Sequence, residues 1–267
     1  MKRIVPLVLS AVLFCSCDNN QQSADKPLNQ GPELVQQFKP LINGTWVKKD
    51  YIKKVKKSKS PLEAVDHGVG VTVFRIDTSK MKGDSIPVAA VVNNHEGETL
   101  TLRFQPGRNT TTIVFGNDEL SYKLKNSDTT LIIYHYDNRT KETSSAQYIK
   151  APDENKVSDL ATAMNLMINQ AILSGNYQGT DATGKPVNAR FTDDGKVSGL
   201  PGLNTYFVQN DHIADPQHSH DEIIFNMNAA GQKSYSFIIN KKILYLYDDA
   251  EHIKSNKPSY TLKRKRD

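Results

Sequence analysis

The chain has 267 residues, enough for one large domain or two small ones, with 34 lysines and arginines against 29 acidic residues. Because it contains only two cysteines, a disulfide-dense scaffold is excluded. The basic residues accompany no nucleic-acid-binding motif, so no nucleic-acid partner is expected.

The first 16 residues have the order of a secretory signal. A positive start is followed by an apolar stretch over residues 4–14, too short to span a bilayer, and the small residue Ser16 precedes Cys17. This order resembles the lipobox of bacterial lipoproteins, in which the cysteine is acylated and becomes the mature N-terminus. The resemblance implies a signal peptide over 1–16, lipidation of Cys17 and a lipid-anchored location in the cell envelope, expected at the outer membrane.

The alternative is a plain signal peptide that is cut near Ser16 without a lipid. Cys15 is the weaker lipidation candidate, because Phe14 would then occupy the cleavage site, where small residues are favoured. If Cys15 is removed and Cys17 is acylated, the mature chain has no free thiol. Disulfides, zinc–thiolate sites and cysteine nucleophiles are then excluded.

Polar and charged segments stand out in the mature chain. Residues 17–31 contain much Asn, Gln, Ser and Pro and little apolar mass, which predicts a lipidated tether without a core. Two basic clusters, at 48–59 and 263–266, raise the sequence pI to about 9.0. Such clusters are typical either of a solvated face or of contact with anionic lipid.

Four short segments recur in the same order in the two halves of the chain. This repetition predicts an internal duplication, with one domain over 32–151 and a second over 152–267. The matched segments are 41–46 with 172–177, 121–124 with 234–237, 132–137 with 243–248, and 148–150 with 260–263.

Between these segments, hydrophobic residues alternate with a period of two. Leu100, Leu102 and Phe104, for example, share one face, and turn clusters such as Gly116-Asn117-Asp118 bound the runs. Seven or eight strands in each half, with no helix between them, predict an antiparallel meander. The expected strands are 69–76, 86–92, 99–105, 110–115, 119–125, 129–136 and 148–150, then 175–180, 187–192, 205–209, 222–227, 233–239, 242–247 and 259–263.

Closing such a meander into a cylinder removes its two edges. The expected fold class is therefore all-β, with two tandem antiparallel up-and-down β-barrels, each preceded by a helix. The two helices are expected over 32–41 and 156–173. The second has apolar residues at helical spacing, with Asp153 and Glu154 at its start, and is expected to plug or flank the second barrel.

A Gly-x-aromatic opening strand after a short helix, followed by a meander, resembles the lipocalin-like superfamily. Gly44-Thr45-Trp46 matches its Gly-x-Trp motif, and Gly175-Asn176-Tyr177 matches with Tyr for Trp. The resemblance implies that Trp46 and Tyr177 close one end of their barrels and that a small apolar molecule binds in a barrel mouth. The order lipobox, tether, paired barrels also resembles uncharacterised lipoproteins of Gram-negative envelopes.

Four tyrosines of the repeated strand are the candidate ligand-binding residues. Tyr134 and Tyr136 share one face of their strand, as do Tyr245 and Tyr247. Facing inward, they would line a cavity with amphipathic rings, whereas facing outward they would cover the interface between the barrels. Aliphatic neighbours would then form the core.

The loop over 211–222 has metal-ligand character. His218 and His220 would face the same way if the loop is extended, and Asp211, His212 or Asp221 could complete a zinc or copper shell. Against this, an Asp-Pro loop is ordinary turn chemistry, and the first half has no counterpart. No cofactor is expected, and metal binding remains an alternative.

Catalytic motifs such as Gly-x-Ser-x-Gly or His-Glu-x-x-His are not found in the sequence. We therefore expect a non-enzymatic envelope lipoprotein that binds a small amphipathic or apolar ligand in a barrel mouth. The alternative is a structural or sensing module that binds another envelope protein, through residues 53–98 and their basic segment 53–59.

Overall fold

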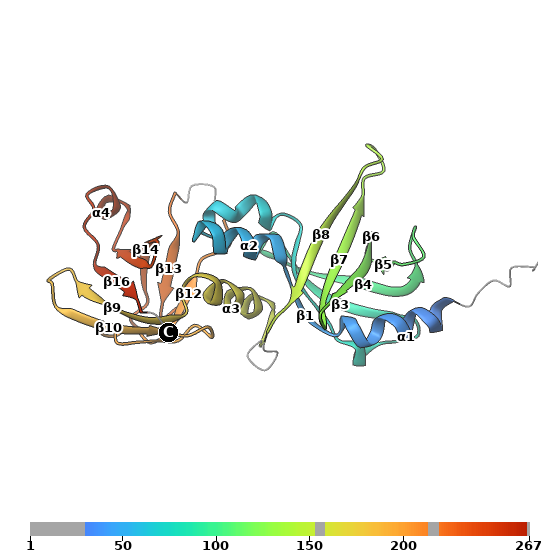
Figure 1. Ribbon diagram of the computed structural model, residues 1–267, viewed down its shortest axis with the longest axis horizontal. Coiled ribbons are helices and arrows are strands. Elements are labelled where there is room, and N and C mark those ends of the chain that lie inside the picture. The colour runs from blue at the N-terminus through green and yellow to red at the C-terminus, as the bar shows by residue number, and fades with distance from the viewer. Residues whose placement is uncertain (1–29, 153–157, 213–218, 266–267) are drawn as a thin grey trace, which may run out of the picture.

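The computed structural model describes residues 30–152, 158–212 and 219–265. Two β-barrels lie at the two ends of an elongated molecule, with helices α2 and α3 between them (Figure 1). The predicted signal peptide, the lipidation site Cys17 and most of the predicted tether lie outside the described residues. Gln30 and Gly31, assigned to the tether, already belong to the first helix.

The first barrel is closed, because β1 pairs with β8 and every other strand pairs with the next along the chain. All neighbouring strands are antiparallel. The strands are β1 Gly44–Lys48, β2 Val71–Ile76, β3 Ser85–Val92, β4 Glu96–Pro106, β5 Ile113–Phe115, β6 Asp118–Lys125, β7 Asp128–Tyr136 and β8 Thr143–Lys150. The helices are α1 Gln30–Ile42, α2 Lys49–Ser58 and the 3₁₀ segments η1 Leu62–Gly68 and η2 Thr78–Lys80.

The second barrel has the same circular strand order, with β9 paired to β16. It is nearly closed, because β11 and β12 are joined only through the bridge between Lys196 and Thr205. The strands are β9 Gly175–Asp181, β10 Pro186–Phe191, β11 Val197–Ser198, β12 Tyr206–Val208, β13 Glu222–Phe225, β14 Lys233–Asn240, β15 Ile243–Tyr247 and β16 Tyr260–Arg264. The helices are α3 Leu160–Ile172 and α4 Ala250–Lys254. The predicted fold class, two tandem antiparallel barrels, is confirmed.

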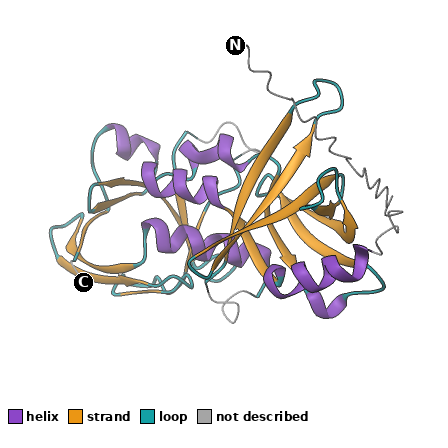
Figure 2. Cartoon of the chain, turned by 45° about the vertical axis from the view of Figure 1, so that its right-hand side comes forward, coloured by secondary structure: helices purple, strands orange, loops and turns teal. Residues whose placement is uncertain are grey.

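Helix α1 lies across one end of the first barrel (Figure 2). It directs Leu34, Phe38 and Ile42 into the same core cluster as the inward side chains of the strands. Phe38 meets Tyr122 of β6 edge to face, with ring centroids 5.1 Å apart. These apolar positions recur at helical spacing and therefore share one face of the helix. Because the helix is short, its stability depends on packing that face against the sheet.

Helix α3 begins later than predicted, at Leu160 rather than at 156. The carboxylate of Asp159 accepts a hydrogen bond from the backbone N–H of Thr162 at 2.7 Å, so Asp159 is the N-cap. The expected start at Asp153 and Glu154 falls in residues that the structure does not describe. The helix contacts α2 and strands of both barrels, so it flanks the second barrel at its junction with the first.

Helix α2 was not predicted, because six of its ten residues are charged. Its apolar residues Tyr51, Ile52 and Val55 are buried against α3. The core of the second barrel thereby continues onto Val47 and Val73, which point outward from the first barrel. Part of the segment expected to be a free docking surface, residues 53–98, is therefore used to join the two barrels.

Polar contacts also cross this junction. The backbone N–H of Leu62 donates to the Asp221 carboxylate at 2.9 Å, and the Asn94 side-chain amide donates to the carbonyl of Asn210 at 3.2 Å. His95 forms a short contact with the Asp211 carboxylate. Together with the shared apolar core, these contacts favour a fixed arrangement of the two barrels.

The two barrels share the local geometry of their first strands. The Trp46 indole N–H donates to the carbonyl of Ile42 at 2.8 Å, and the Tyr177 hydroxyl donates to that of Leu173 at 2.7 Å. In both cases the acceptor is four residues earlier, at the end of the preceding helix. The strand register then places Lys150 opposite Trp46 and Arg264 opposite Tyr177.

Two residues before Lys150 and Arg264, this register makes Tyr148 of β8 equivalent to Leu262 of β16. The matched sequence segments 148–150 and 260–263 had instead paired Tyr148 with Tyr260. Leu131 pairs with Tyr148, and Leu244 pairs with Leu262, so Leu131 is equivalent to Leu244. The sequence match of 132–137 with 243–248 is therefore wrong by two residues. A shift of two leaves every side chain on its predicted face, which is why the pattern alone did not reveal it.

Candidate functional site

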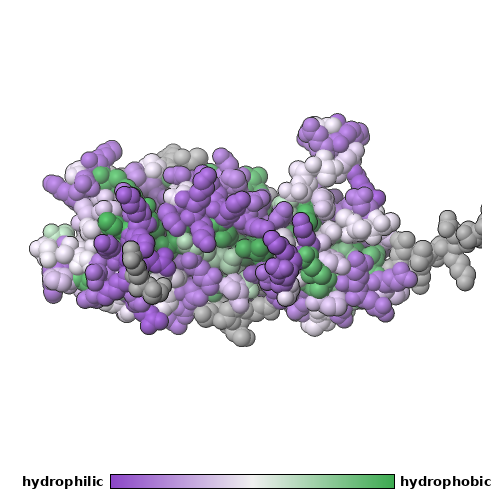
Figure 3. Space-filling view, in the orientation of Figure 1, coloured by the Kyte–Doolittle hydropathy of each residue, from purple (hydrophilic) through white to green (hydrophobic). Residues whose placement is uncertain are grey.

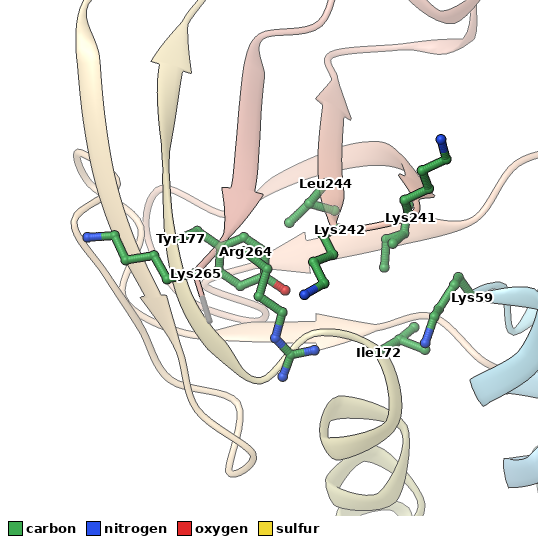
Figure 4. Close-up of a pocket in the computed structure, with 9 residues that line it drawn as sticks. Lys59, Ile172, Tyr177, Lys241, Lys242, Leu244, Arg264 and Lys265 are labelled. Atoms are coloured by element: carbon green, nitrogen blue, oxygen red, sulfur yellow. The ribbon is translucent and has the colours of Figure 1, made fainter. Parts of the chain in front are cut away.

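A basic pocket lies at the helix-covered end of the second barrel (Figure 4). It has a volume of about 580 Å³. Strands β9, β14, β15 and β16, the C-terminal end of α3 and the residue after α2 all contribute to its wall. We call it the basic pocket, and its lining residues are Lys59, Ile172, Tyr177, Ile239, Lys241, Lys242, Leu244, Arg264 and Lys265.

Arg264 is held at the centre of the pocket by the last strand. Its backbone N–H donates to the carbonyl of Lys242 at 2.8 Å, and its guanidinium donates to the carbonyl of Ser174. Gly175 makes room for the guanidinium, because a Cβ at this position would lie 2.6 Å from Arg264 Nε and the backbone φ is +148°. One guanidinium N–H bonded to a carbonyl leaves further donors for a ligand.

The Lys242 side chain comes from the tight turn between β14 and β15. Asn240 and Ile243 face each other across this two-residue turn, and Lys241 has φ +55°. Glycine, Asn or Asp are the usual residues at such a φ. In Figure 4, the amine of Lys242 points toward the pocket centre, whereas Lys241 and Lys265 extend outward.

Lys59 enters the pocket from the first half of the chain. It ends α2 in a left-handed conformation, with φ +66°, and its backbone N–H donates to the carbonyl of Val55. Burial, followed by the positive charges of Arg264 and Lys56, lowers the pKa of the Lys59 amine. Lys59 and Arg264, from the two halves of the chain, line the same pocket.

The electrostatics of the basic pocket favour an anion. Five of its lining residues are cationic, and none is acidic. Lys59, Lys241 and Lys242 form no ion pair with any described residue. The floor is apolar, because Ile172, Tyr177, Ile239 and Leu244 line it, and all of these except the partly buried Ile239 are buried. Burial raises the pKa of Tyr177 to about 12, so its hydroxyl stays neutral. The arrangement can bind a negative head group beside an apolar tail.

The first barrel has a pocket at the equivalent place, lined by Trp46 and Lys150. Its tight turn carries Asn126 and Ser127, where the second barrel has two lysines. Asp128 adds a carboxylate to the lining. The same framework therefore surrounds a site of mixed charge in the first barrel and a cationic site in the second.

Another pocket opens at the mouth of the first barrel, between Val71, Ile133 and residues that bear charge. The Tyr148 hydroxyl donates to the carbonyl of Val71 at 2.8 Å, and His135 pairs with the Asp118 carboxylate at 2.7 Å. These polar groups satisfy one another, so this pocket has less unpaired bonding capacity than the basic pocket.

The four candidate tyrosines do not line either barrel interior. Tyr134 and Tyr136 lie on the outer face of β7, and the Arg108 guanidinium lies 3.5 Å from the Tyr136 ring centroid. Tyr245 and Tyr247 stack on the outer face of β15, with centroids 6.4 Å apart. None of the four belongs to either core cluster, since Leu131 and Ile133 of β7 and Leu244 and Leu246 of β15 take the inward positions.

Large side chains occupy the interiors of both barrels. In the first, the Phe74 ring lies 5.2 Å from Phe115 and 4.9 Å from Tyr148, centroid to centroid. In the second, Phe191 lies 5.4 Å from Tyr177 and 5.2 Å from Tyr206. The basic pocket consequently lies beside the packed core rather than within it.

The predicted closing residues lie where the helix meets the first strand. Trp46 is fully buried, Tyr177 is 3% exposed, and each bonds the carbonyl four residues earlier. Gly44 and Gly175 both have positive φ, of +127° and +148°, which favours glycine. These four positions are thus equivalent in the two barrels.

The predicted metal ligands are only partly described. His218 lies outside the described residues, and the ring of His220 contacts the hydroxyl of Ser219 at 2.7 Å. Asp221 turns instead toward the first barrel and accepts from Leu62. Over 30–152, 158–212 and 219–265, no three His, Cys, Asp or Glu side chains are grouped as metal ligands would be.

Sequence reasoning missed Arg264, Lys242 and Lys59 as site residues. Lys59 and Arg264 belong to the clusters 48–59 and 263–266, which were visible by charge, but nothing in the order of residues indicated that these clusters meet. An available signal was the Lys-Lys pair at the tip of a predicted hairpin, where small turn residues are expected.

Comparisons with known proteins add little. No protein-family model and no curated protein matches the chain. Among solved structures it is similar to a protein of unknown function from the DUF3598 family of Nostoc punctiforme PCC 73102, at 10% sequence identity and a TM-score of 0.24, over 83% of this chain and 76% of that one. The two barrels themselves fit a lipocalin-like fold.

The surface in the view of Figure 3 is mostly hydrophilic, with smaller hydrophobic areas between. Among the described residues, every helix is too short or too polar to cross a bilayer.

Proposed function

We propose that this protein is a non-enzymatic binding protein of the cell envelope, anchored through a lipid on Cys17, and that its basic pocket binds an amphiphile with an anionic head. The proposal rests on one observation. Two cationic side chains that form no ion pair with described residues, Lys59 and Lys242, converge with Arg264 on a pocket with an apolar floor and no acidic residue. Such a gathering of like charges is unfavourable unless an anion or solvent screens it.

Each part of the pocket has a role in this proposal. Arg264 offers a planar fork of donors to a carboxylate or phosphate, and Lys242 supplies a mobile point charge. The ligand's alkyl portion would contact Ile239, the partly buried aliphatic side chain of the lining. The basic pocket replaces the barrel mouth as the ligand site, because both interiors are occupied by aromatic side chains.

Binding is tested with octanoate, and with octyl glucoside as a neutral amphiphile of equal chain length, by calorimetry on the full chain. Octanoate should bind and the glucoside should not. Lys242→Gln should weaken octanoate binding several-fold, whereas Lys254→Gln, which removes an exposed lysine outside the pocket, should not change it. Equal binding of the two amphiphiles, or equal effects of the two variants, would refute the proposal.

The lipid anchor is tested separately by labelling cells with an alkynyl palmitate. We expect Cys17→Ser to abolish labelling and release the protein from the membrane fraction, and Cys15→Ser to change neither. Labelling that persists in Cys17→Ser would show the anchor assignment to be wrong. The second candidate, docking of another envelope protein through residues 53–98, is less favoured, because Val55, Ala64 and Val73 of this segment already pack in the core of the second barrel.

A further inference from the structure

The basic pocket is completed across the junction of the two barrels. Lys59 follows α2, in the first half of the chain, whereas Lys242 and Arg264 belong to the second barrel. In Figure 4, Lys59 approaches the pocket from the side of α2, opposite the strand that carries Arg264. A ligand that contacts all three would touch both halves of the molecule.

The number and spread of the cations distinguish between head groups. A carboxylate carries one charge and two oxygens, which a single Arg can satisfy in a bidentate manner. A phosphate monoester carries a charge of about −1.5 to −2 near neutral pH and three strong acceptor oxygens. Three donors on three separate elements match three oxygens better than two.

From this geometry we infer that the basic pocket takes a phosphate monoester, whose phosphate group bridges Lys59 of the first half to Lys242 and Arg264 of the second. The inference rests on the proposed function and names its ligand class. Its consequence is that ligand binding stabilises the junction between the barrels, because the bound phosphate replaces the repulsion between Lys59 and Arg264 with attraction.

The junction already has polar contacts that such a bridge would reinforce. Leu62, three residues after Lys59, donates its backbone N–H to the Asp221 carboxylate of the second barrel. The segment that follows Lys59 is therefore attached to the second barrel.

The test compares octyl phosphate with octanoate on the full chain, by calorimetry at pH 7.5. Octyl phosphate should bind about tenfold more tightly, and its affinity should fall as the pH is lowered through about 6, where the phosphate gains a proton. Lys59→Gln should remove most of this preference. Lys53→Gln changes an exposed lysine of α2 outside the pocket, so it is the matched control and should leave the preference intact.

The source of the monoester is distinguished by competition. Displacement of octyl phosphate by vesicles of phosphatidylcholine containing phosphatidic acid, but not by inorganic phosphate, would support a lipid head group. Displacement by inorganic phosphate alone would support a soluble phosphate compound. Either result supports the phosphate inference.

Three results would overturn it: equal affinity for octyl phosphate and octanoate, a preference that survives Lys59→Gln, or an affinity that does not depend on pH. If octanoate still binds and Lys242→Gln still weakens it, the proposed function stands and only the phosphate assignment fails. If neither alkyl anion binds, both fail.

Discussion

The helix-covered ends of the two barrels are built on the same framework and carry different charges. In each, a helix leads through a glycine of positive φ to a buried aromatic side chain, which bonds the carbonyl four residues earlier. In each, a basic residue of the last strand lies opposite that aromatic. Around this frame, the first barrel places Asn126, Ser127 and Asp128, whereas the second places Lys241 and Lys242.

This difference separates what closes a barrel from what the barrel can bind. The helix, the glycine and the aromatic are constrained by backbone geometry and packing, so they are alike at both ends. Residues of the tight turn face solvent and have few packing constraints, so their charge can differ without affecting closure. The cationic end is also the one that faces the other barrel, since Lys59 reaches it from α2.

The largest effect on stability is expected from removing Trp46, the buried aromatic residue at the helix-covered end of the first barrel. Trp46→Ala should lower the free energy of unfolding by about 3 to 5 kcal/mol, because it empties a fully buried volume and leaves the carbonyl of Ile42 without its donor. Urea denaturation followed by far-ultraviolet circular dichroism measures this. Trp46→Tyr, which introduces the residue of the second barrel, should cost much less. A loss below about 1 kcal/mol for the alanine variant would show that the aromatic does not close the barrel.

The second prediction concerns the junction beside the cationic end. Burial raises the pKa of Asp221 to about 6, above the 3.8 of an exposed aspartate. Below pH 3.8 the carboxyl is protonated in both the folded and the unfolded chain. As the pH rises through 6 the folded chain must ionise it as well, so its stabilising contribution is lost. The free energy of unfolding should therefore fall by up to about 3 kcal/mol between pH 4 and pH 7.

Asp221→Asn provides the control for this pH dependence. Its amide keeps an oxygen that can accept from Leu62 but cannot ionise. The variant should be more stable than the parent at pH 7, and the difference should shrink toward pH 4. Parallel stability profiles for the two proteins, measured by urea denaturation at several pH values, would contradict the assignment.

Exchanging the turn residues should transfer the difference in anion binding between the helix-covered ends of the two barrels. Lys241→Asn combined with Lys242→Ser gives the second barrel the turn residues of the first, and should weaken octanoate binding about tenfold, or about 1.4 kcal/mol. The reverse exchange, Asn126→Lys with Ser127→Lys, should create only weak binding, because Asp128 remains beside the turn. Calorimetry on both variants checks this, and an unchanged affinity in the first would place the ligand elsewhere.

The smallest effect is expected from Tyr177→Phe. It removes the hydroxyl that donates to Leu173 but keeps the ring, so it should cost about 1 kcal/mol of stability. Octanoate affinity should stay the same, because this hydroxyl already has a partner. Thermal unfolding measures the loss of stability, and calorimetry measures the octanoate affinity. A large loss of affinity with little loss of stability would make the hydroxyl a ligand contact instead.

Most strands were predictable because their inward and outward residues alternate. In β4, for example, Leu100, Leu102 and Phe104 share the inward face. Helix α2 was not, because its three buried residues are spread among lysines whose charged ends reach solvent. The two-residue strand β11 was too short for any periodic signal. In the candidate site, Gly175 and Tyr177 were visible in the sequence as a Gly-x-aromatic motif. The cationic residues Lys59, Lys242 and Arg264 were not assigned to the site.

The sequence by itself determined the all-β class, the two barrels and the helices before them, because these follow from local periodicity. It showed the glycine–aromatic pairs through the repeated segments and their resemblance to the lipocalin-like motif. Only the tertiary structure decided which residues meet. The register between strands can shift by two without changing any face, so the equivalence of Tyr148 with Leu262 had to come from pairing. Likewise, Lys59 and Arg264 are about two hundred residues apart in the chain, and only the packing of α2 on α3 brings their charges to one pocket.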